Sequence, residues 1–149
     1  MQHPTISIGL HLTNSTIPTY ATSGSSGFDF KAYIKETTVL GPNKRILIPT
    51  GLKFQIPIGY ELQIRSKSGL ALKNGIIVLN SPGTVDSDYR QDVGIILFNT
   101  SDENFIIEPN MKIAQGVICP IYQASFKILK EDDLNVTERI GGFGSTGTY

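Results

Sequence analysis

The segment 65–71, with the sequence Arg-Ser-Lys-Ser-Gly-Leu-Ala, holds residue types that can bind an anion. Ser68 is a helix N-cap candidate in front of good helix formers, and Asn74-Gly75 offers a stop, so one short helix is predicted here. The unpaired N–H groups at a helix start attract negative charge, Ser68 adds a hydroxyl, and Gly69 lets a phosphate approach the backbone. This segment, with the charge of Lys67, therefore predicts a phosphate-binding site.

A second group of residues that could take part in catalysis lies in the segment 86–90, with the sequence Asp-Ser-Asp-Tyr-Arg. A carboxylate such as Asp86 can orient and deprotonate a water molecule. Taken alone, Asp86, Asp88 and Arg90 are typical of a solvated charged turn. The segment follows residues 80–84, Asn-Ser-Pro-Gly-Thr, which join two apolar runs and are predicted to form a hairpin tip. The interpretation of Asp86 therefore depends on the residues that precede it.

The elements that must position these residues are short β-strands. Apolar runs rich in Ile, Val, Phe and Tyr recur between Gly, Pro, Asn and Asp, which predicts an all-β sandwich or barrel. Alternation within residues 60–65 places Leu62 and Ile64 on one buried face. The predicted strands span 6–12, 28–34, 45–48, 51–56, 60–66, 76–80, 93–99, 105–107 and 112–118.

The C-terminal part has a different composition. From about Asp132 the apolar alternation stops, and residues 141–147 read Gly-Gly-Phe-Gly-Ser-Thr-Gly, too glycine-rich for a core strand. Such a tail is expected to be mobile until something orders it. We therefore expect a single domain over residues 1–149, with 132–149 as a C-terminal arm.

Composition narrows the function further. The 149 residues carry 13 Lys plus Arg and 13 Asp plus Glu, so a long nucleic acid is not an expected partner. One cysteine, Cys119, and the two histidines, His3 and His11, cannot build a zinc site, and Cys119 is expected to be a core residue. No stretch resembles a signal peptide or a membrane span, so no membrane contact and a cytoplasmic location are expected.

Five segments, taken in order, resemble the five sequence motifs of the trimeric all-β dUTPase family, and they cover nearly the whole chain. The most specific is 80–90, which is similar to the family's uracil hairpin and catalytic Asp-x-Asp-Tyr-Arg stretch nearly residue for residue. The resemblance implies a distorted jelly-roll or β-clip barrel with one short helix and a mobile glycine-rich arm. It also implies hydrolysis of dUTP to dUMP and diphosphate with Mg²⁺.

Three motifs concern the phosphates and the metal. By resemblance, Asp29 in segment 26–32 holds waters of the Mg²⁺ shell. Lys67, Ser68 and Gly69 correspond to the family's phosphate-binding motif, with Lys67 where the family has Arg, so the planar fork of a guanidinium is lost. Gln115 in segment 112–118 is similar to the family residue that contacts the phosphate chain.

The motif at 80–90 concerns the base, the sugar and the reaction. A hairpin tip that contains Asn80, Gly83 and Val85 can match the O2, N3–H and O4 edge of uracil, and cytosine is rejected because its donor and acceptor are inverted. By resemblance Tyr89 lies flat under the deoxyribose and leaves no space for a 2′-hydroxyl. By resemblance, Asp86 is expected to be the catalytic residue that activates the water attacking the α-phosphorus.

The last motif is the arm. Its glycines allow backbone N–H groups to wrap phosphate oxygens. Resemblance assigns Phe143 to stacking on the base and Gly144, Ser145 and Thr146 to the phosphates. Arg139 matches the arginine assigned to the γ-phosphate, although the spacing from Arg139 to the Gly-Phe pair is one residue shorter than is usual in the family.

The resemblance further implies a homotrimer in which three chains share each active site. Two alternatives remain. A deoxycytidine triphosphate deaminase has a related fold, but the uracil-type hairpin and the complete arm argue against it. A dUTPase-like protein that binds nucleotide and regulates partners without turnover is the other, and Asp86 argues against it, because a pure binder has no need for a carboxylate at the water position.

Overall fold

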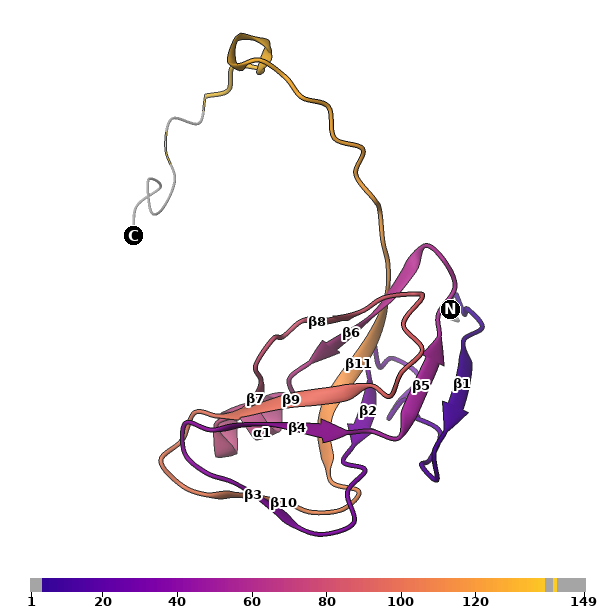
Figure 1. The fold of residues 1–149 in the computed structure, drawn as a ribbon, viewed down its shortest axis with the longest axis vertical. Coiled ribbons are helices and arrows are strands. Elements are labelled where there is room, and N and C mark those ends of the chain that lie inside the picture. The colour runs from indigo at the N-terminus through magenta and orange to yellow at the C-terminus, as the bar shows by residue number, and fades with distance from the viewer. Residues whose placement is uncertain (1–3, 139–140, 142–149) are drawn as a thin grey trace.

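In the computed structural model, the described residues are 4–138 and 141, and they form an all-β body with one short α-helix (Figure 1). The arrangement confirms the predicted fold class. The elements are β1 (Gly9–Leu12), β2 (Phe28–Lys31), β3 (Thr38–Leu40), β4 (Arg45–Pro49), β5 (Leu52–Gln55), β6 (Tyr60–Arg65), α1 (Ser68–Asn74), β7 (Ile76–Val78), β8 (Gly83–Val85), β9 (Gly94–Asn99), β10 (Phe105–Ile107), β11 (Lys112–Pro120) and the 3₁₀ turn η1 (Glu131–Asp133).

The strands pair into four sheets. The largest has the order β2-β11-β6-β8, a second has the order β4-β9-β7, and two pairs, β1-β5 and β10-β3, complete the body. All the pairings are antiparallel. Within the described part of the chain each sheet keeps two edge strands, so the distorted barrel is not closed.

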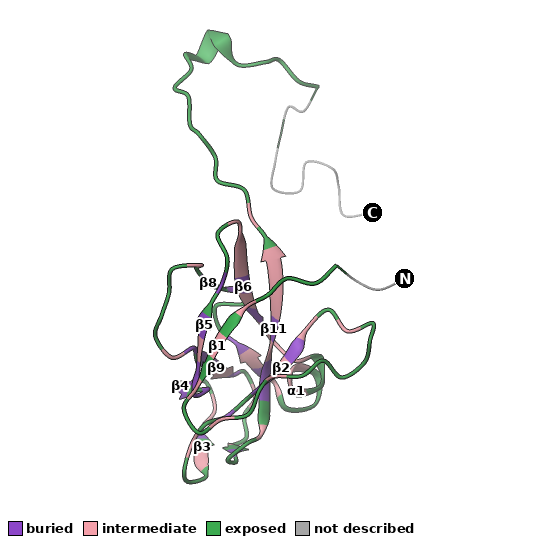
Figure 2. Cartoon of the chain, turned by 90° about the vertical axis from the view of Figure 1, so that its right-hand side faces the viewer, coloured by how far each residue is buried: buried purple, intermediate pink, exposed green. Residues whose placement is uncertain are grey.

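The core lies between these sheets and is built from the alternate residues of their strands (Figure 2). Leu62 and Ile64 of β6 are buried, as the alternation predicted. Phe28, Phe30 and Phe54 pack with ring centroids 5.4 to 6.3 Å apart. A Cβ on Gly116 of β11 would lie 2.6 Å from the Phe30 ring, so this close packing requires glycine.

Helix α1 forms where a short helix was predicted, but it begins one residue differently. The N-cap is Lys67, with extended backbone at φ −89° and ψ 124°, and Ser68 is the first helical residue. The prediction that Ser68 is the cap is therefore wrong. No side chain caps the helix, because the hydroxyl of Ser68 already lies inside the first turn. The helix ends as expected at Gly75, in the left-handed conformation with φ 65°.

The expected hairpin around residues 80–84 has a different form. The turn is present, but β7 pairs with β9 and β8 pairs with β6, so the two flanking strands belong to different sheets. Leu79 N–H still donates to Ile96 C=O at 2.9 Å, which continues the β7-β9 ladder up to the turn. The segment 79–82 therefore crosses from one sheet to another, and the exposed residues Asn80 to Pro82 do not lie in a ladder.

The chain leaves the body after β11 and runs outward in Figures 1 and 2. Residues 122–138 are exposed throughout, including the large apolar side chains of Tyr122, Phe126, Ile128 and Val136, each 94–99% exposed. The departure from the body thus lies upstream of residue 132, where the arm was expected to begin. No helix within the described residues is long and apolar enough to cross a membrane.

Candidate active site

Three charged side chains from three elements meet at one end of the largest sheet. Asp29 is the second residue of β2, and Lys112 is the first residue of β11. Lys67 is the residue directly before α1, at the N-cap position. The ammonium group of Lys67 binds Asp29 Oδ1, and Lys112 Nζ lies 2.7 Å from Asp29 Oδ2. Each carboxylate oxygen thus holds one ammonium group, and the cluster keeps a net positive charge that suits an anion.

The ionised form of Asp29 is favoured in this cluster. Burial raises the pKa of the carboxyl, but the hydrogen bonds and charges of Lys112 and Lys67 outweigh it, and the pKa lies below its ordinary value. An ionised carboxylate has about four lone-pair sites, and the two lysines use one on each oxygen. Asp29 can therefore also accept hydrogen bonds from waters on a cation. The role of Asp29 in holding a Mg²⁺ shell through water stays a prediction, since both of its oxygens already bind ammonium groups.

Gln115 joins the same region from β11. Its register partner on β2 is Asp29, and its Nε2 donates to the Ser66 carbonyl at 2.9 Å. The Ser66 hydroxyl in turn accepts a hydrogen bond from Val78 N–H at 2.8 Å. The loop that carries Lys67 is thereby fixed to β11 on one side and to β7 on the other.

Ser68 and Gly69 form the first turn of α1 and are both exposed. The first helical hydrogen bond within α1 runs from Ala71 N–H to Lys67 C=O at 3.0 Å, so the preceding N–H groups have no intrahelical acceptor. A Cβ on Gly69 would meet no protein atom within 4 Å. Lys67, Ser68, Gly69, Gln115 and Asp29 therefore come together as predicted, and we call them the phosphate cluster.

The residues predicted to bind the base lie on β8 and the turn before it. Gly83 and Val85 are buried and pair with Ile64 and Leu62 of β6, whereas Asn80 is exposed. A Cβ on Gly83 would lie 3.1 Å from Asn80 Nδ2, so the Asn80 amide lies against the Gly83 backbone. We call residues 80–86 the base segment.

Asp86 follows β8 directly and is exposed. Its carboxylate makes no hydrogen bond or ion pair within the described residues. The Asp86 carbonyl accepts Tyr89 N–H at 3.2 Å, which closes a turn, and the Tyr89 ring is 41% exposed. The Asp86 carboxylate is thus open to solvent and accessible to a ligand.

Arg90 has a structural role. Its Nη1 donates to the carbonyls of Ser87 at 2.7 Å and Tyr89 at 3.1 Å, and it reaches Phe54 O at 3.4 Å. Arg90 is exposed, as expected of a charged turn, and its guanidinium in addition contacts the carbonyls of that turn. Cys119, expected in the core, is only half-buried, and Arg65 Nη2 lies 3.7 Å from its sulfur.

The phosphate cluster and the base segment lie on the same four-stranded sheet, linked through β6. No side-chain hydrogen bond or ion pair joins them in the part of the chain that the structure describes. The arm residues Arg139, Phe143, Gly144, Ser145 and Thr146 lie outside the described residues.

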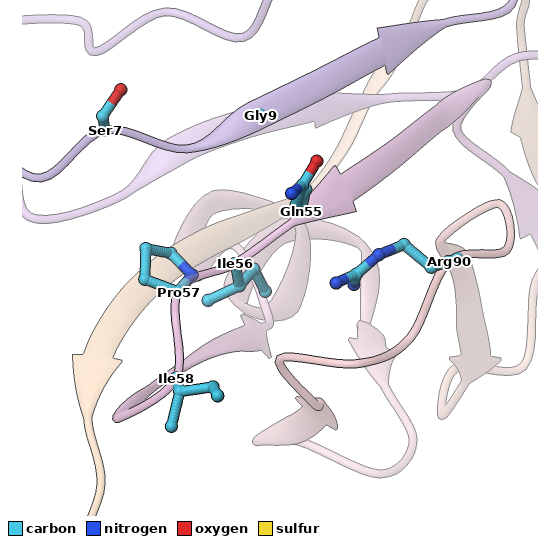
Figure 3. A pocket seen from close by; sticks show the side chains of 7 residues that line it. All are labelled: Ser7, Gly9, Gln55, Ile56, Pro57, Ile58 and Arg90. Atoms are coloured by element: carbon cyan, nitrogen blue, oxygen red, sulfur yellow. The ribbon is translucent and has the colours of Figure 1, made fainter.

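Two pockets lie outside the base segment. The larger, of about 480 Å³, is lined by Arg90 and by residues of β1 and the β5 end: Ser7, Gly9, Gln55, Ile56, Pro57 and Ile58 (Figure 3). None of the predicted site residues lines it. The smaller, of about 160 Å³, includes Asp29 and Lys112 with the segment 15–19. Of the predicted site residues, only Asp29 lines either of these two pockets.

Two residues of the site region were given no role from the sequence. Lys112 starts a segment already compared with the family, and its charge was the available signal. Asp92 accepts hydrogen bonds at Oδ1 from Thr50 N–H at 3.1 Å and Gly51 N–H at 3.3 Å. Nothing in the local sequence indicates that contact, because it spans about forty residues.

Known sequences identify the family to which this chain is similar. The family model described as dUTPase matches residues 13–147. The deoxyuridine 5′-triphosphate nucleotidohydrolase of Chlamydia caviae is 53% identical over 137 residues, which cover 91% of this chain and 93% of that protein. The protein of the same name from Chlamydia pneumoniae is 56% identical over 132 residues, covering 88% of this chain and 90% of that protein.

Solved structures agree as well. A mutant dUTPase of Staphylococcus bacteriophage 80alpha with dUpNHpp has a TM-score of 0.80 at 25% identity, covering 96% of this chain and 99% of that chain. The dUTPase of phage phi11 of S. aureus, in a structure that describes a structural Mg(II) ion, shares the fold with a TM-score of 0.77 at 23% identity, covering 87% and 100%. This likeness confirms the predicted jelly roll. With a family match over most of its length and relatives more than half identical, the chain belongs to the dUTPase family.

Proposed function

We propose that this protein hydrolyses dUTP to dUMP and diphosphate. The observation that carries the proposal is the base segment, where the unpaired carboxylate of Asp86 directly follows a strand and turn with the family's uracil-binding sequence. The chlamydial relatives are named for this activity, and the phage relative is known with dUpNHpp.

Base selection follows from the exposed turn. The backbone of residues 80–82 lies outside the ladders. Ser81 N–H donates to the Val78 carbonyl at 3.2 Å and Pro82 has no N–H, so the Asn80 N–H and the carbonyls of this turn can pair with the uracil edge while the Asn80 side-chain amide supplies further contact. A cytosine would leave buried donors and acceptors unpaired. Gly83 and Val85 are buried in β8, which holds this edge in place. Tyr89, half-exposed after Asp86, is placed to contact the deoxyribose.

Asp86 acts as the general base in this proposal. It takes a proton from the water that attacks the α-phosphorus, and the diphosphate leaves with the electrons of the broken P–O bond. Reaction of a triphosphate depends mostly on positioning and on neutralising charge. Lys67, the first-turn N–H groups at Ser68 and Gly69, and Gln115 are the groups of this chain that bind and orient the phosphates.

Mg²⁺ fits the residues present. Asp29, ionised and with lone pairs remaining, would hold the waters of its shell, and the chemistry that Mg²⁺ supplies when bound is neutralisation of the phosphate charge. Among the described residues no group of three or more His, Cys, Asp or Glu side chains could hold a metal directly. The cation is therefore expected to bind together with the triphosphate.

We further propose a homotrimer with shared active sites, as a single domain over residues 1–149. Two observations support assembly. The phosphate cluster and the base segment do not contact each other through side chains within the described residues, and residues 122–138 expose Phe126, Ile128 and Val136 with no cover from their own body. Another copy of the chain can cover this segment and bring the groups together. Arg139, Phe143, Gly144, Ser145 and Thr146 then close over the substrate of another chain.

The substrate proposal is tested by measuring diphosphate release from dUTP, dCTP, dTTP and UTP, with and without Mg²⁺. We expect dUTP to be cleaved far faster than the others, with dUMP as product and with dependence on Mg²⁺. Ammonia release from dCTP would instead identify a deaminase, and binding of dUTP without turnover would identify a regulator. Either outcome would overturn the proposal.

The shared site is tested by mixing two inactive forms. Chains with Asp86→Asn and chains truncated before Gly141 are refolded together in equal amounts. A mixed trimer can unite an intact Asp86 from one chain with an intact arm from another, so roughly a quarter of the sites should regain activity in a closed ring. If mass measurements find mixed trimers and activity stays at the level of the parents, the sites are not shared.

A further inference from the structure

Asp92 is a polar residue that none of the five motifs assigns to substrate. It lies half-buried where the chain leaves the Asp86–Tyr89 turn and enters β9. Its side chain accepts hydrogen bonds at Oδ1 from Thr50 N–H at 3.1 Å and from Gly51 N–H at 3.3 Å. Its main-chain carbonyl accepts the Tyr89 hydroxyl at 3.1 Å. Asp92 therefore links the turn between β4 and β5 to Tyr89.

The turn between β4 and β5, which Asp92 binds, is tightly packed. Thr50 is 1% exposed, and Gly51 adopts φ +69° with its Cβ position 3.0 Å from the Tyr33 ring. The Ser15 hydroxyl donates to Thr50 C=O at 3.1 Å, and Thr13 N–H donates to Gly51 C=O at 2.9 Å. A carboxylate bound to this turn is bound to the fixed part of the fold.

The Tyr89 ring, in contrast, has weak support of its own. It is 41% exposed, so packing leaves its two side-chain torsions partly free. Its backbone is held because its N–H donates to Asp86 C=O at 3.2 Å. The hydrogen bond from its hydroxyl to Asp92 is the polar contact of its side chain among the described residues. The orientation of the ring plane therefore depends on where the Asp92 carbonyl lies.

We propose that Asp92 is a positioning residue for Tyr89 and, through it, a determinant of the preference for deoxyribose over ribose. The inference rests on the proposed function, because Tyr89 must be the residue under the sugar. Val93 already pairs with the β4–β5 turn, because Thr50 N–H also donates to the Val93 carbonyl at 3.2 Å and Val93 N–H donates to the Leu52 carbonyl at 2.9 Å. The carboxylate adds to these bonds in fixing the Asp92 backbone, the Asp92 carbonyl fixes the Tyr89 hydroxyl, and the ring then excludes a 2′-hydroxyl. Without the carboxylate, the Tyr89 ring is held less firmly in its orientation, and the site accommodates a ribose more easily.

The test compares kcat and KM for dUTP and UTP in Asp92→Ala, Asp92→Asn and the control Asp102→Ala. Asp102 is an exposed carboxylate on the β9–β10 connection, and it makes no hydrogen bond or ion pair with Asp92 or Tyr89 among the described residues. We expect Asp92→Ala to raise KM for dUTP and to lower the dUTP/UTP ratio of kcat/KM about tenfold, the size of one lost partly buried hydrogen bond. The kcat for dUTP changes much less. Asp92→Asn keeps the Oδ1 acceptor and should restore the ratio.

A second variant decides the matter if Asp92→Ala does not fold. Tyr89→Phe leaves the contacts of the Asp92 carboxylate intact and removes only the hydroxyl, so it should also lower the dUTP/UTP ratio. An unchanged ratio in Tyr89→Phe, or a loss of melting temperature in Asp92→Ala with an unchanged ratio, would overturn the positioning role. Wild-type protein that does not cleave dUTP would instead overturn the proposed function, which the same assay reveals first.

Discussion

Replacing Gly69 by alanine should move stability and activity in opposite directions. Gly69 lies in the first turn of α1, its φ is not in the left-handed region, and a Cβ there would meet no protein atom within 4 Å. Alanine is favoured over glycine in a helix by about 0.5–1 kcal/mol. The substitution should therefore raise the melting temperature by roughly 1–4 °C for a chain of this length.

The same methyl group would stand where a phosphate is expected to approach the backbone. Displacing a reacting group by about 1 Å can cost on the order of 10²-fold in rate, so we expect kcat/KM for dUTP to fall by about ten- to a hundredfold. Gly24→Ala is the matched control, because a Cβ on Gly24 also meets nothing within 4 Å and Gly24 lies outside the site. The control should keep its activity.

Thermal unfolding and steady-state kinetics on the two variants separate the possible results. A higher melting temperature with unchanged kcat/KM would mean that no phosphate comes close to Gly69, and the phosphate cluster would be wrongly placed. A lower melting temperature would mean that a protein group, from another copy, fills this space. Either result would refute the reasoning.

The remaining predictions concern the carboxylates. Asp86→Asn should lower kcat by roughly 10²–10⁴-fold while a non-hydrolysable dUTP analogue still binds in calorimetry, and a rate near wild type would show that another group handles the water. Asp29 has a pKa below its ordinary value of 3.8, so its contacts with Lys67 and Lys112 stabilise the fold above that pH and are lost as the pH falls through the folded value. The difference in melting temperature between wild type and Asp29→Asn should therefore be present at pH 7 and shrink below about pH 3.8, and a difference independent of pH would contradict the ion cluster.

The strands that the sequence predicted are those with several alternating apolar residues. β6, β9 and β10 form within one residue of their predicted bounds, because burial of one face decides the structure there. β3 and β8 were not predicted. Each has three residues, as β10 does, but their sequences Thr-Val-Leu and Gly-Thr-Val hold fewer large apolar side chains than the Phe-Ile-Ile of β10. Their partners, β10 and β6, hold them in place through contacts distant in sequence.

The sequence indicated individual residues of the site, but it did not indicate the contacts between them. Motif resemblance placed Asp29, Lys67 and Gln115, and the structure brings them together. The contact of Lys112 with Asp29 depends on the β2–β11 register, which includes a bulge between Lys112 and Ala114. No local pattern in the sequence reveals such a bulge.

The β2–β11 register explains how a lysine can be accommodated at position 67. An arginine binds a carboxylate through both oxygens at once, whereas an ammonium group binds through one. Lys67 on Oδ1 leaves Oδ2 to Lys112, so the two lysines divide between them the carboxylate that one arginine could occupy alone. Each ammonium group also keeps donors that Asp29 does not use. Under the proposed function, the phosphate chain can therefore bind Lys67 while Asp29 still holds this lysine in place.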